Sequence, residues 1–220
     1  MEITPLGHSC FRMKGRDVSV VTDPFGGEDL RYSPLSASAD VVTISHEHPH
    51  HAAWPNVGGT PRVFRGPGEY EIRGAMIWGV QTYRRRVEGG PRLRNTSYLF
   101  KIEDLSICHL GDLGEPLTAE QLARLKEASV LLVPVGGHCT LDAAEAAEVV
   151  ARIEPKIVIP MHYGTPATEG TLELDPVTRF CKEMGAADAV PQNRLNVTTS
   201  SLPDDVTLVL LEPRRQDPAR

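Results

Sequence analysis

Residues 45–51 read Ser-His-Glu-His-Pro-His-His and contain four of the eight histidines in the 220-residue chain. They directly follow the strand-like run 40–44. Imidazole nitrogens bind divalent metals at about 2 Å, and a turn at Pro49 would bring several of them together. Histidine-rich tracts also occur as unstructured metal scavengers or tags, but this tract is internal and follows a strand. It therefore predicts a metal centre at the C-terminal end of a strand.

The other four histidines occupy similar positions, because each lies within a few residues after an apolar run and none lies in an expected helix. Histidines scattered through a hydrophobic core would not show this regularity. We infer that strand ends bring the histidines to a single site. The four are His8, His109, His138 and His162, after the runs 3–6, 105–108, 130–135 and 156–160.

Two aspartates follow strand-like runs in the same way. Asp112 stands in a Gly-Asp turn and is expected to supply a carboxylate that one metal ion holds or two share. Asp23 follows the run 18–22, and it is a candidate to support a ligand, since a ligating imidazole usually donates its other N–H to a carboxylate. Asp23-Pro24 is also a common turn pair, and composition alone does not decide between these interpretations.

The loop between the strand-like runs 76–83 and 96–102 is rich in arginine. Guanidinium groups suit bidentate contacts with phosphate or carboxylate, so the loop could clamp an anionic substrate group. The pattern is also that of a solvated hairpin tip, which is the interpretation we favour. The five arginines are Arg84, Arg85, Arg86, Arg92 and Arg94.

Length and composition indicate one globular domain over residues 1–220. The 19 glycines and 18 prolines favour many turns between short strands, and hence a β-rich α/β protein. A net charge of −6 argues against a nucleic-acid partner, because phosphate binding needs a basic surface. The sequence has neither a signal-peptide pattern nor 18 consecutive apolar residues, so we expect a cytoplasmic protein without a membrane partner.

The four cysteines, Cys10, Cys108, Cys139 and Cys181, show no C-x-x-C spacing and are expected to be reduced thiols. Cys108 and Cys139 each stand beside a histidine, so either could lie near the site. We favour a role as a small buried hydrophobic residue for both.

Helices are expected mainly in the C-terminal half. Thr118 and Gln121 have capping-box spacing and predict a helix to about residue 128. Thr140 is expected to cap a helix over 141–153, and the strand–helix–strand order here predicts a right-handed crossover with both strand C-termini at one edge. The remaining expected elements are a helix over 175–184, a strand over 206–211 and a frayed tail over 212–220.

The His46-x-His48-x-x-His51 cluster, the Gly111-Asp112 turn and the distant His162 resemble the signature of the metallo-β-lactamase superfamily, H-x-H-x-D-H followed by later metal ligands. More narrowly, the chain resembles a bacterial branch of Zn-dependent hydrolases with the L-ascorbate-6-phosphate lactonase-like arrangement. The resemblance implies a four-layer αββα sandwich with the site at one edge of the two sheets. Supporting segments occur in the expected order at 6–9, 22–25, 66–70, 109–114, 134–137 and 160–163.

Carried over by position, the resemblance implies that His46 and His48 bind a first metal ion, that His51 and His162 bind a second, and that Asp112 bridges them. One or two ions fit this set. Imidazoles with one carboxylate suit zinc first, with manganese, iron or nickel as alternatives.

The chain departs from the family pattern at two positions. His50 replaces the aspartate of H-x-H-x-D-H, and Arg84 stands where the family has a middle histidine. The first change removes a negative charge near the second metal position, and the second change removes an imidazole from the first position.

The implied activity is hydrolysis of an ester, lactone or phosphodiester by metal-activated water. Asp112 and His50 are the catalytic candidates, with His50 either ligating or moving protons. The rival interpretation is a degenerate member that binds a metal or an anion and acts as a sensor or scaffold without turnover. We expect a small-molecule substrate, with an anionic one as an option, and leave homo-oligomerisation open. Candidates to support the site or contact the substrate are His8, Asp23, Arg84, His109 and His138.

Overall fold

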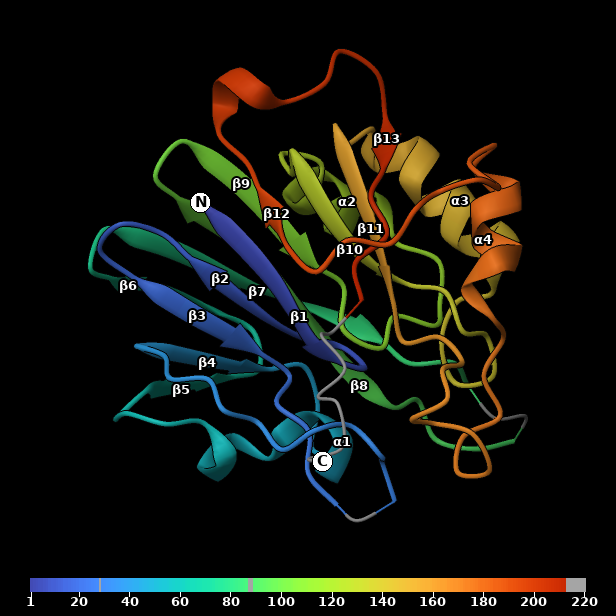
Figure 1. The fold of residues 1–220 in the computed structure, drawn as a ribbon, viewed down its shortest axis with the longest axis horizontal. Coiled ribbons are helices and arrows are strands. Elements are labelled where there is room, and N and C mark those ends of the chain that lie inside the picture. The colour runs from blue at the N-terminus through green and yellow to red at the C-terminus, as the bar shows by residue number, and fades with distance from the viewer. Residues whose placement is uncertain (28, 87–88, 213–220) are drawn as a thin grey trace, which may run out of the picture.

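Two mixed β-sheets pack face to face in the computed structural model, which describes residues 1–27, 29–86 and 89–212 (Figure 1). The first sheet has six strands in the order β12-β1-β2-β3-β4-β5, of which β3, β4 and β5 run parallel. Its strands are β1 (Glu2–Gly7), β2 (Cys10–Lys14), β3 (Ser19–Thr22), β4 (Val41–Ile44), β5 (Arg62–Arg65) and β12 (Leu195–Asn196).

The second sheet has seven strands in the order β13-β11-β10-β9-β8-β7-β6. Strands β9, β10, β11 and β13 are parallel, whereas β6 to β9 form an antiparallel meander. Its strands are β6 (Gly68–Ile72), β7 (Ala75–Tyr83), β8 (Arg94–Ile102), β9 (Leu105–His109), β10 (Val130–Pro134), β11 (Ile157–Met161) and β13 (Thr207–Leu208).

The main core lies between the two sheets. In β1 every second residue is buried, as expected for a strand with one face on the core and one on the surface. Strands β10 and β11 are instead buried at every position, because their sheet is covered on both faces. Ile3, Tyr98 and Phe100 are among the fully buried side chains of this core.

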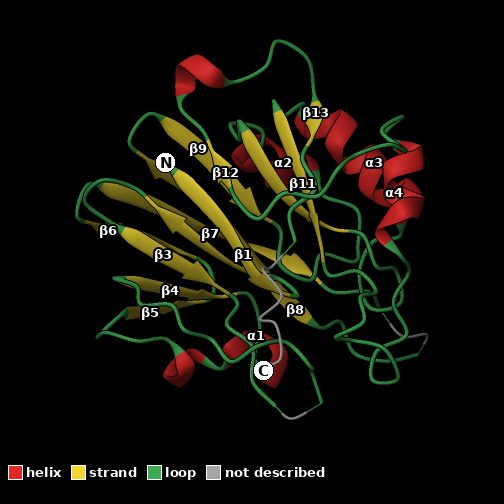
Figure 2. Ribbon diagram, in the orientation of Figure 1, coloured by secondary structure: helices red, strands yellow, loops and turns green. Residues whose placement is uncertain are grey.

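Helices cover the outer face of the seven-stranded sheet (Figure 2). They are α2 (Ala119–Leu125), α3 (Ala143–Ile153) and α4 (Val177–Glu183). The outer face of the six-stranded sheet carries the short helices α1 (Pro49–Ala52) and η1 (Trp54–Asn56), together with an apolar cluster that includes Phe25 and Leu30. The expected α/β sandwich is therefore confirmed, with a loop-rich layer on one side.

Helix ends agree with the sequence expectations in part. Thr118 caps α2 in a capping box with Gln121, as predicted. The prediction that Thr140 caps the next helix is wrong, because the N-cap of α3 is Asp142. The Asp142 side chain accepts from the backbone N–H of Glu145, and the Glu145 side chain accepts from the backbone N–H of Asp142. Thr140 is buried, and its hydroxyl donates to the carbonyl of Gly137.

The C-terminal strand is shorter than predicted. Strand β13 covers only Thr207–Leu208, and Leu211 forms a separate bridge with Gln192. The 3-10 helix η2 (Thr199–Ser201) precedes it. The frayed tail was predicted over 212–220; residues 213–220 lie outside the described residues, and the backbone N–H of Glu212 donates to the carbonyl of Gln192 at 3.0 Å.

The direction of the strands places many of their C-terminal ends at one edge of the sandwich. Strands β9, β10 and β11 are parallel, and β7 runs in the same direction as β9 because two antiparallel steps separate them. Strand β1 runs in the same direction as β3, because two antiparallel steps separate them as well, and β4 is parallel to β3. Loops after these strands therefore meet across the two sheets.

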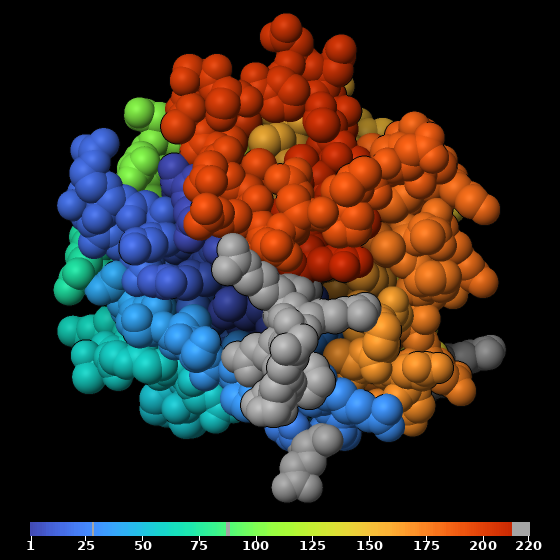
Figure 3. Space-filling model, viewed as in Figure 1, coloured from blue at the N-terminus to red at the C-terminus, as the bar shows by residue number. Residues whose placement is uncertain are grey.

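The N-terminal strand lies beside a segment from the C-terminal part of the chain. Strand β1 pairs with β12, and the blue N-terminal strands adjoin the red C-terminal segment on the face shown in Figure 3. Among the described residues, every helix is too short or too polar to cross a membrane.

Candidate metal centre

A buried carboxylate, that of Asp112, lies at the middle of the strand-end edge and is 1% exposed. Its Oδ1 lies 3.4 Å from Nε2 of both His51 and His162. Its Oδ2 lies 3.6 Å from Nε2 of His46 and 3.5 Å from Nε of Arg84. The loop after β9 thus meets α1 and the ends of β4, β7 and β11, which confirms that distant strand ends converge.

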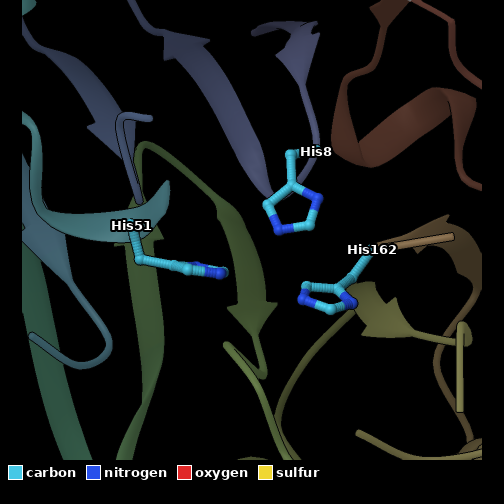
Figure 4. A group of neighbouring side chains, drawn as sticks. All are labelled: His8, His51 and His162. Atoms are coloured by element: carbon cyan, nitrogen blue, oxygen red, sulfur yellow. The ribbon is translucent and has the colours of Figure 1, made fainter. Parts of the chain in front are cut away.

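A third imidazole joins the Oδ1 side. His8, in the turn after β1, has its ring centroid 4.2 Å from that of His162 and 5.1 Å from that of His51. Figure 4 shows the three rings turned toward a common space from three separate segments. His8 and His162 both adopt left-handed backbone conformations, with φ of 54°. Such conformations are costly for residues other than glycine and are concentrated at functional sites.

Several buried polar atoms here have no hydrogen-bond partner among the described residues. They are both ring nitrogens of His8, Nε2 of His46, Oδ1 of Asp112 and Nδ1 of His162. An unsatisfied buried polar group costs about 1–3 kcal/mol, so their concentration in one place requires a reason. Nitrogen and carboxylate oxygen are also the donors that divalent metals take.

The donor atoms gather in three overlapping groups, in each of which they lie within 4.8 Å of one another. The residues present therefore fit a divalent metal ion. The groups are His8, His51 and His162; His46, His51 and Asp112; and Asp112, Cys139 and His162.

The charge states of four of these groups, those of His8, His46, His51 and Asp112, favour ligation. Burial lowers the pKa of His8, and it lowers that of His46 and His51 to about 3, because a desolvated imidazolium is unfavourable. Burial also lowers the pKa of His162, but the carboxylate of Asp112 outweighs it and raises the value to about 9. Burial raises the pKa of Asp112, yet the surrounding cationic groups hold it well below its ordinary value. Without metal, the lone pairs of His8, His46 and His51 and the negative charge of Asp112 thus face one space, and a metal ion would displace the proton of His162.

Residues 2–162 match a family model described as a β-lactamase superfamily domain. The chain belongs to the metallo-β-lactamase superfamily. A UPF0173 metal-dependent hydrolase from Methanopyrus kandleri is 30% identical over 195 residues, covering 75% of this chain and 85% of that protein. A Thermotoga maritima structure described as a Zn-dependent hydrolase of this superfamily is 36% identical, with a TM-score of 0.77, over 96% of this chain and 98% of that one. Within the superfamily the chain thus falls among the metal-dependent hydrolases.

In this superfamily member, Asp23 holds the orientation of His51. The Asp23 carboxylate is fully buried and accepts from Nδ1 of His51 at 2.9 Å, leaving Nε2 of His51 with its lone pair toward Asp112. It also accepts from the backbone N–H of Ser45 at 2.8 Å and from its hydroxyl at 2.5 Å. Asp23 is thus placed to fix the tautomer of an imidazole that belongs to two of the donor groups.

An Asp23→Asn variant is expected to bind its metal about 10- to 100-fold more weakly, the usual cost of losing an outer carboxylate partner. Asp40→Asn is the matched control, because Asp40 also accepts from the N–H and hydroxyl of one serine, Ser19, at 2.8 Å each. Asp40 is absent from the three donor groups among the described residues. Competition with a chromogenic chelator measures both affinities, and equal losses in the two variants would refute the role assigned to Asp23.

His48 and His50, both predicted ligands, lie beside the donor groups rather than in them. Nδ1 of His48 accepts from the backbone N–H of His50 at 3.2 Å, which caps α1. Nε2 of His50 lies 2.8 Å from Oδ2 of Asp29, whose side chain is half exposed. The sequence indicated a turn at Pro49 but not that α1 would turn His50 toward Asp29.

Of the other sequence candidates, His109 and His138 lie apart from the three donor groups among the described residues. His109 is fully buried. Its Nε2 lies 2.8 Å from the carbonyl oxygen of Ser9, and its Nδ1 accepts from the backbone N–H of Gly111. It therefore braces the turn that carries Asp112. His138 is exposed.

Of the loop arginines whose contacts the structure describes, only Arg84 faces Asp112. Arg85 pairs with Glu145, and Arg92 pairs with Glu115 and lies over the ring of Tyr83. Arg86 donates to the carbonyl of Gly90. Arg84 alone contacts the metal centre, as described above.

Sequence reasoning missed residues that support the centre. Cys139, set aside as a hydrophobic residue, is half buried beside Asp112 and His162; its position after β10 was the available signal. Asn95, buried in β8, accepts through Oδ1 from the backbone N–H of Asp112 at 2.9 Å and donates to the carbonyl of Leu110 at 2.8 Å. No pattern in the sequence marks Asn95, because its partners belong to another strand end.

Proposed function

We propose that this chain hydrolyses an ester, lactone or phosphodiester bond of a small molecule, using a divalent metal ion held at the strand-end edge. One observation supports this most: the Asp112 carboxylate lies among buried imidazoles, and Nε2 of His46, Nδ1 of His162 and both ring nitrogens of His8 have no partner among the described residues. The lactonase-like branch within the superfamily stays a prediction.

The metal would be held by residues from the three donor groups, with zinc as the first choice and manganese, iron or nickel as alternatives. When bound, a divalent ion lowers the pKa of water toward about 7 and polarises a carbonyl or phosphoryl oxygen. The chain supplies the rest. Arg84 directs a guanidinium into the site, where its N–H groups stabilise negative charge that develops on the substrate.

His50 is proposed to move protons rather than to ligate. Its ring is buried, with Nε2 held by the half-exposed carboxylate of Asp29, so it connects the interior of the site with solvent. A histidine oriented by a carboxylate is a usual general acid or base. Asp29 itself keeps a lowered pKa, chiefly through its hydrogen bond with His50, and so stays an anion that orients the ring.

A cavity of about 940 Å³ extends from His8 across the outer face of β1 and is proposed as the substrate pocket. Arg12, Arg31 and Arg194 line it, and Nε of Arg12 is buried without a partner among the described residues. This lining supports an anionic small molecule as the substrate. The absence of nucleic-acid and membrane partners stays a prediction, and homo-oligomerisation stays open.

The test uses protein purified without a tag. We expect it to carry a divalent metal by elemental analysis and to hydrolyse at least one member of a panel of esters, lactones and phosphodiesters. His51→Ala should lose both properties, whereas His138→Ala, at an exposed histidine, should keep both. Metal binding with only background rates across the panel would favour the non-catalytic sensor or scaffold. A wild-type protein without affinity for any divalent metal would refute the proposal.

A further inference from the structure

The two oxygens of Asp112 face different surroundings. Oδ1 is within 3.4 Å of Nε2 of two imidazoles, His51 and His162. Oδ2 is 3.6 Å from one imidazole, His46, and 3.5 Å from the guanidinium of Arg84. The carboxylate therefore has two imidazoles on one side, and one imidazole with a permanently charged guanidinium on the other.

The Oδ1 side is completed by His8. This side chain is 8% exposed, and neither of its ring nitrogens has a hydrogen-bond partner among the described residues. It shares a donor group with His51 and His162, and Figure 4 shows the three rings directed at one space. A buried imidazole with two unsatisfied nitrogens is unfavourable unless a ligand uses it.

The Oδ2 side is poorer in donors and richer in positive charge. Arg84 is permanently charged, and its Nε, directed at Oδ2, is buried without another partner among the described residues. His48 contributes little here, because its Nδ1 already accepts from the N–H of His50. A second ion at this side would have to share Oδ2 with a guanidinium.

We propose that this chain binds a single divalent ion on the Oδ1 side of Asp112, and that the Arg84 guanidinium is a fixed cation in place of a second ion on the Oδ2 side. The ligands of the single ion are His8, His51 and His162, which form one donor group, and Oδ1 of Asp112, which lies 3.4 Å from Nε2 of both His51 and His162. His8 thereby supplies the ligand that His50, engaged by Asp29, does not. The inference rests on the proposed function, because it names the residues that bind the metal ion required for the proposed hydrolysis.

The first experiment counts metal ions. Tag-free wild-type protein is equilibrated with zinc or manganese, passed through a desalting column and assayed for metal per chain. We expect one equivalent in the wild type and in Arg86→Met, a change at an exposed arginine of the same loop. Arg84→His removes the fixed charge and adds an imidazole, so it should bind two equivalents. Two equivalents in the wild type, or a single one in Arg84→His, would overturn the assignment of Arg84.

The second experiment tests His8. His8→Ala is compared with His138→Ala, because both histidines have left-handed backbones, with φ of 54° and 55°, and the substitution strains both alike. Loss of an outer partner weakens metal binding about 10- to 100-fold, and we expect His8→Ala to weaken binding of the single ion by more than that. We expect His138→Ala to leave the metal affinity unchanged. Unchanged affinity in His8→Ala would overturn its role as a ligand. Thermal unfolding without metal checks that both variants fold, and His8→Asn, which suits this backbone better, replaces His8→Ala if that variant does not.

These outcomes separate the inference from the proposed function. A wild type that binds two ions and needs them for hydrolysis refutes the single-ion centre but supports the hydrolase. A wild type that binds no ion refutes both. The readouts are metal content and affinity, which do not require the substrate to be known.

Discussion

An Asp112→Asn variant is expected to lose metal binding and hydrolysis together. The change keeps the shape of the side chain but removes the negative charge that lies within 3.6 Å of three imidazoles and one guanidinium. Removing one partner of a buried charged set costs about 3–5 kcal/mol, which corresponds to a loss of about two to four orders of magnitude in metal affinity. Elemental analysis and chelator competition measure the loss, and the panel of esters and lactones measures the activity.

The same variant should also be less stable without metal. Arg84 and His162 lose their counter-charge, and the positive charge that remains is largely buried. Asp40→Asn is again the control, because it removes a hydrogen-bonded aspartate from the same protein without touching the site. Metal affinity and activity that survive in Asp112→Asn at wild-type levels would show that Asp112 is not part of the centre.

A Gly111→Ala variant is expected to displace Asp112 from the centre. Gly111 has a φ of 60°, and a Cβ there would lie 2.5 Å from both Oδ1 of Asn95 and Cβ of Ser45. Asn95 holds the backbone of Asp112, and Ser45 holds the carboxylate of Asp23. Left-handed strain of about 1–2 kcal/mol and overpacking of about 1–3 kcal/mol add to a loss of about 2–5 kcal/mol in the free energy of unfolding.

Gly74→Ala separates these two costs. Gly74 has a φ of 76°, but a Cβ there would meet nothing within 4 Å, so only the backbone strain applies. Denaturant unfolding should show a loss of about 1–2 kcal/mol for Gly74→Ala, with metal affinity unchanged. Gly111→Ala should lose both stability and affinity. Equal effects of the two variants would show that the close packing around Gly111 does not position Asp112.

The class of the fold could be predicted because its signals are local. Apolar runs such as 130–135 and 156–160 mark buried strands, and the Thr118–Gln121 capping box marks the start of a helix. The cap of the next helix was assigned wrongly because Thr140 and Asp142 are both suitable residues, and only the surroundings decide which side chain is free to cap. Thr140 is taken up by the carbonyl of Gly137.

The candidate site was predictable in its chemistry but not in its detailed membership. Strand ends that carry His46, His51, Asp112 and His162 were expected to converge, and they do. The distinction between His8, which joins a donor group, and His109, which braces a turn, depends on where β1 lies relative to β9 and β11. These strands belong to different sheets, and no local pattern encodes their relative position.

By itself the sequence determined which chemical groups would stand at the ends of strands, because residue type and the alternation between apolar runs and turns are properties of short segments. Only the tertiary structure decided which of them face one another. It turned His50 to Asp29, brought His8 against His162 and placed Arg84 at Oδ2 of Asp112. These contacts join segments far apart in the chain, and they are fixed by the packing of two sheets whose register depends on all of their strands at once.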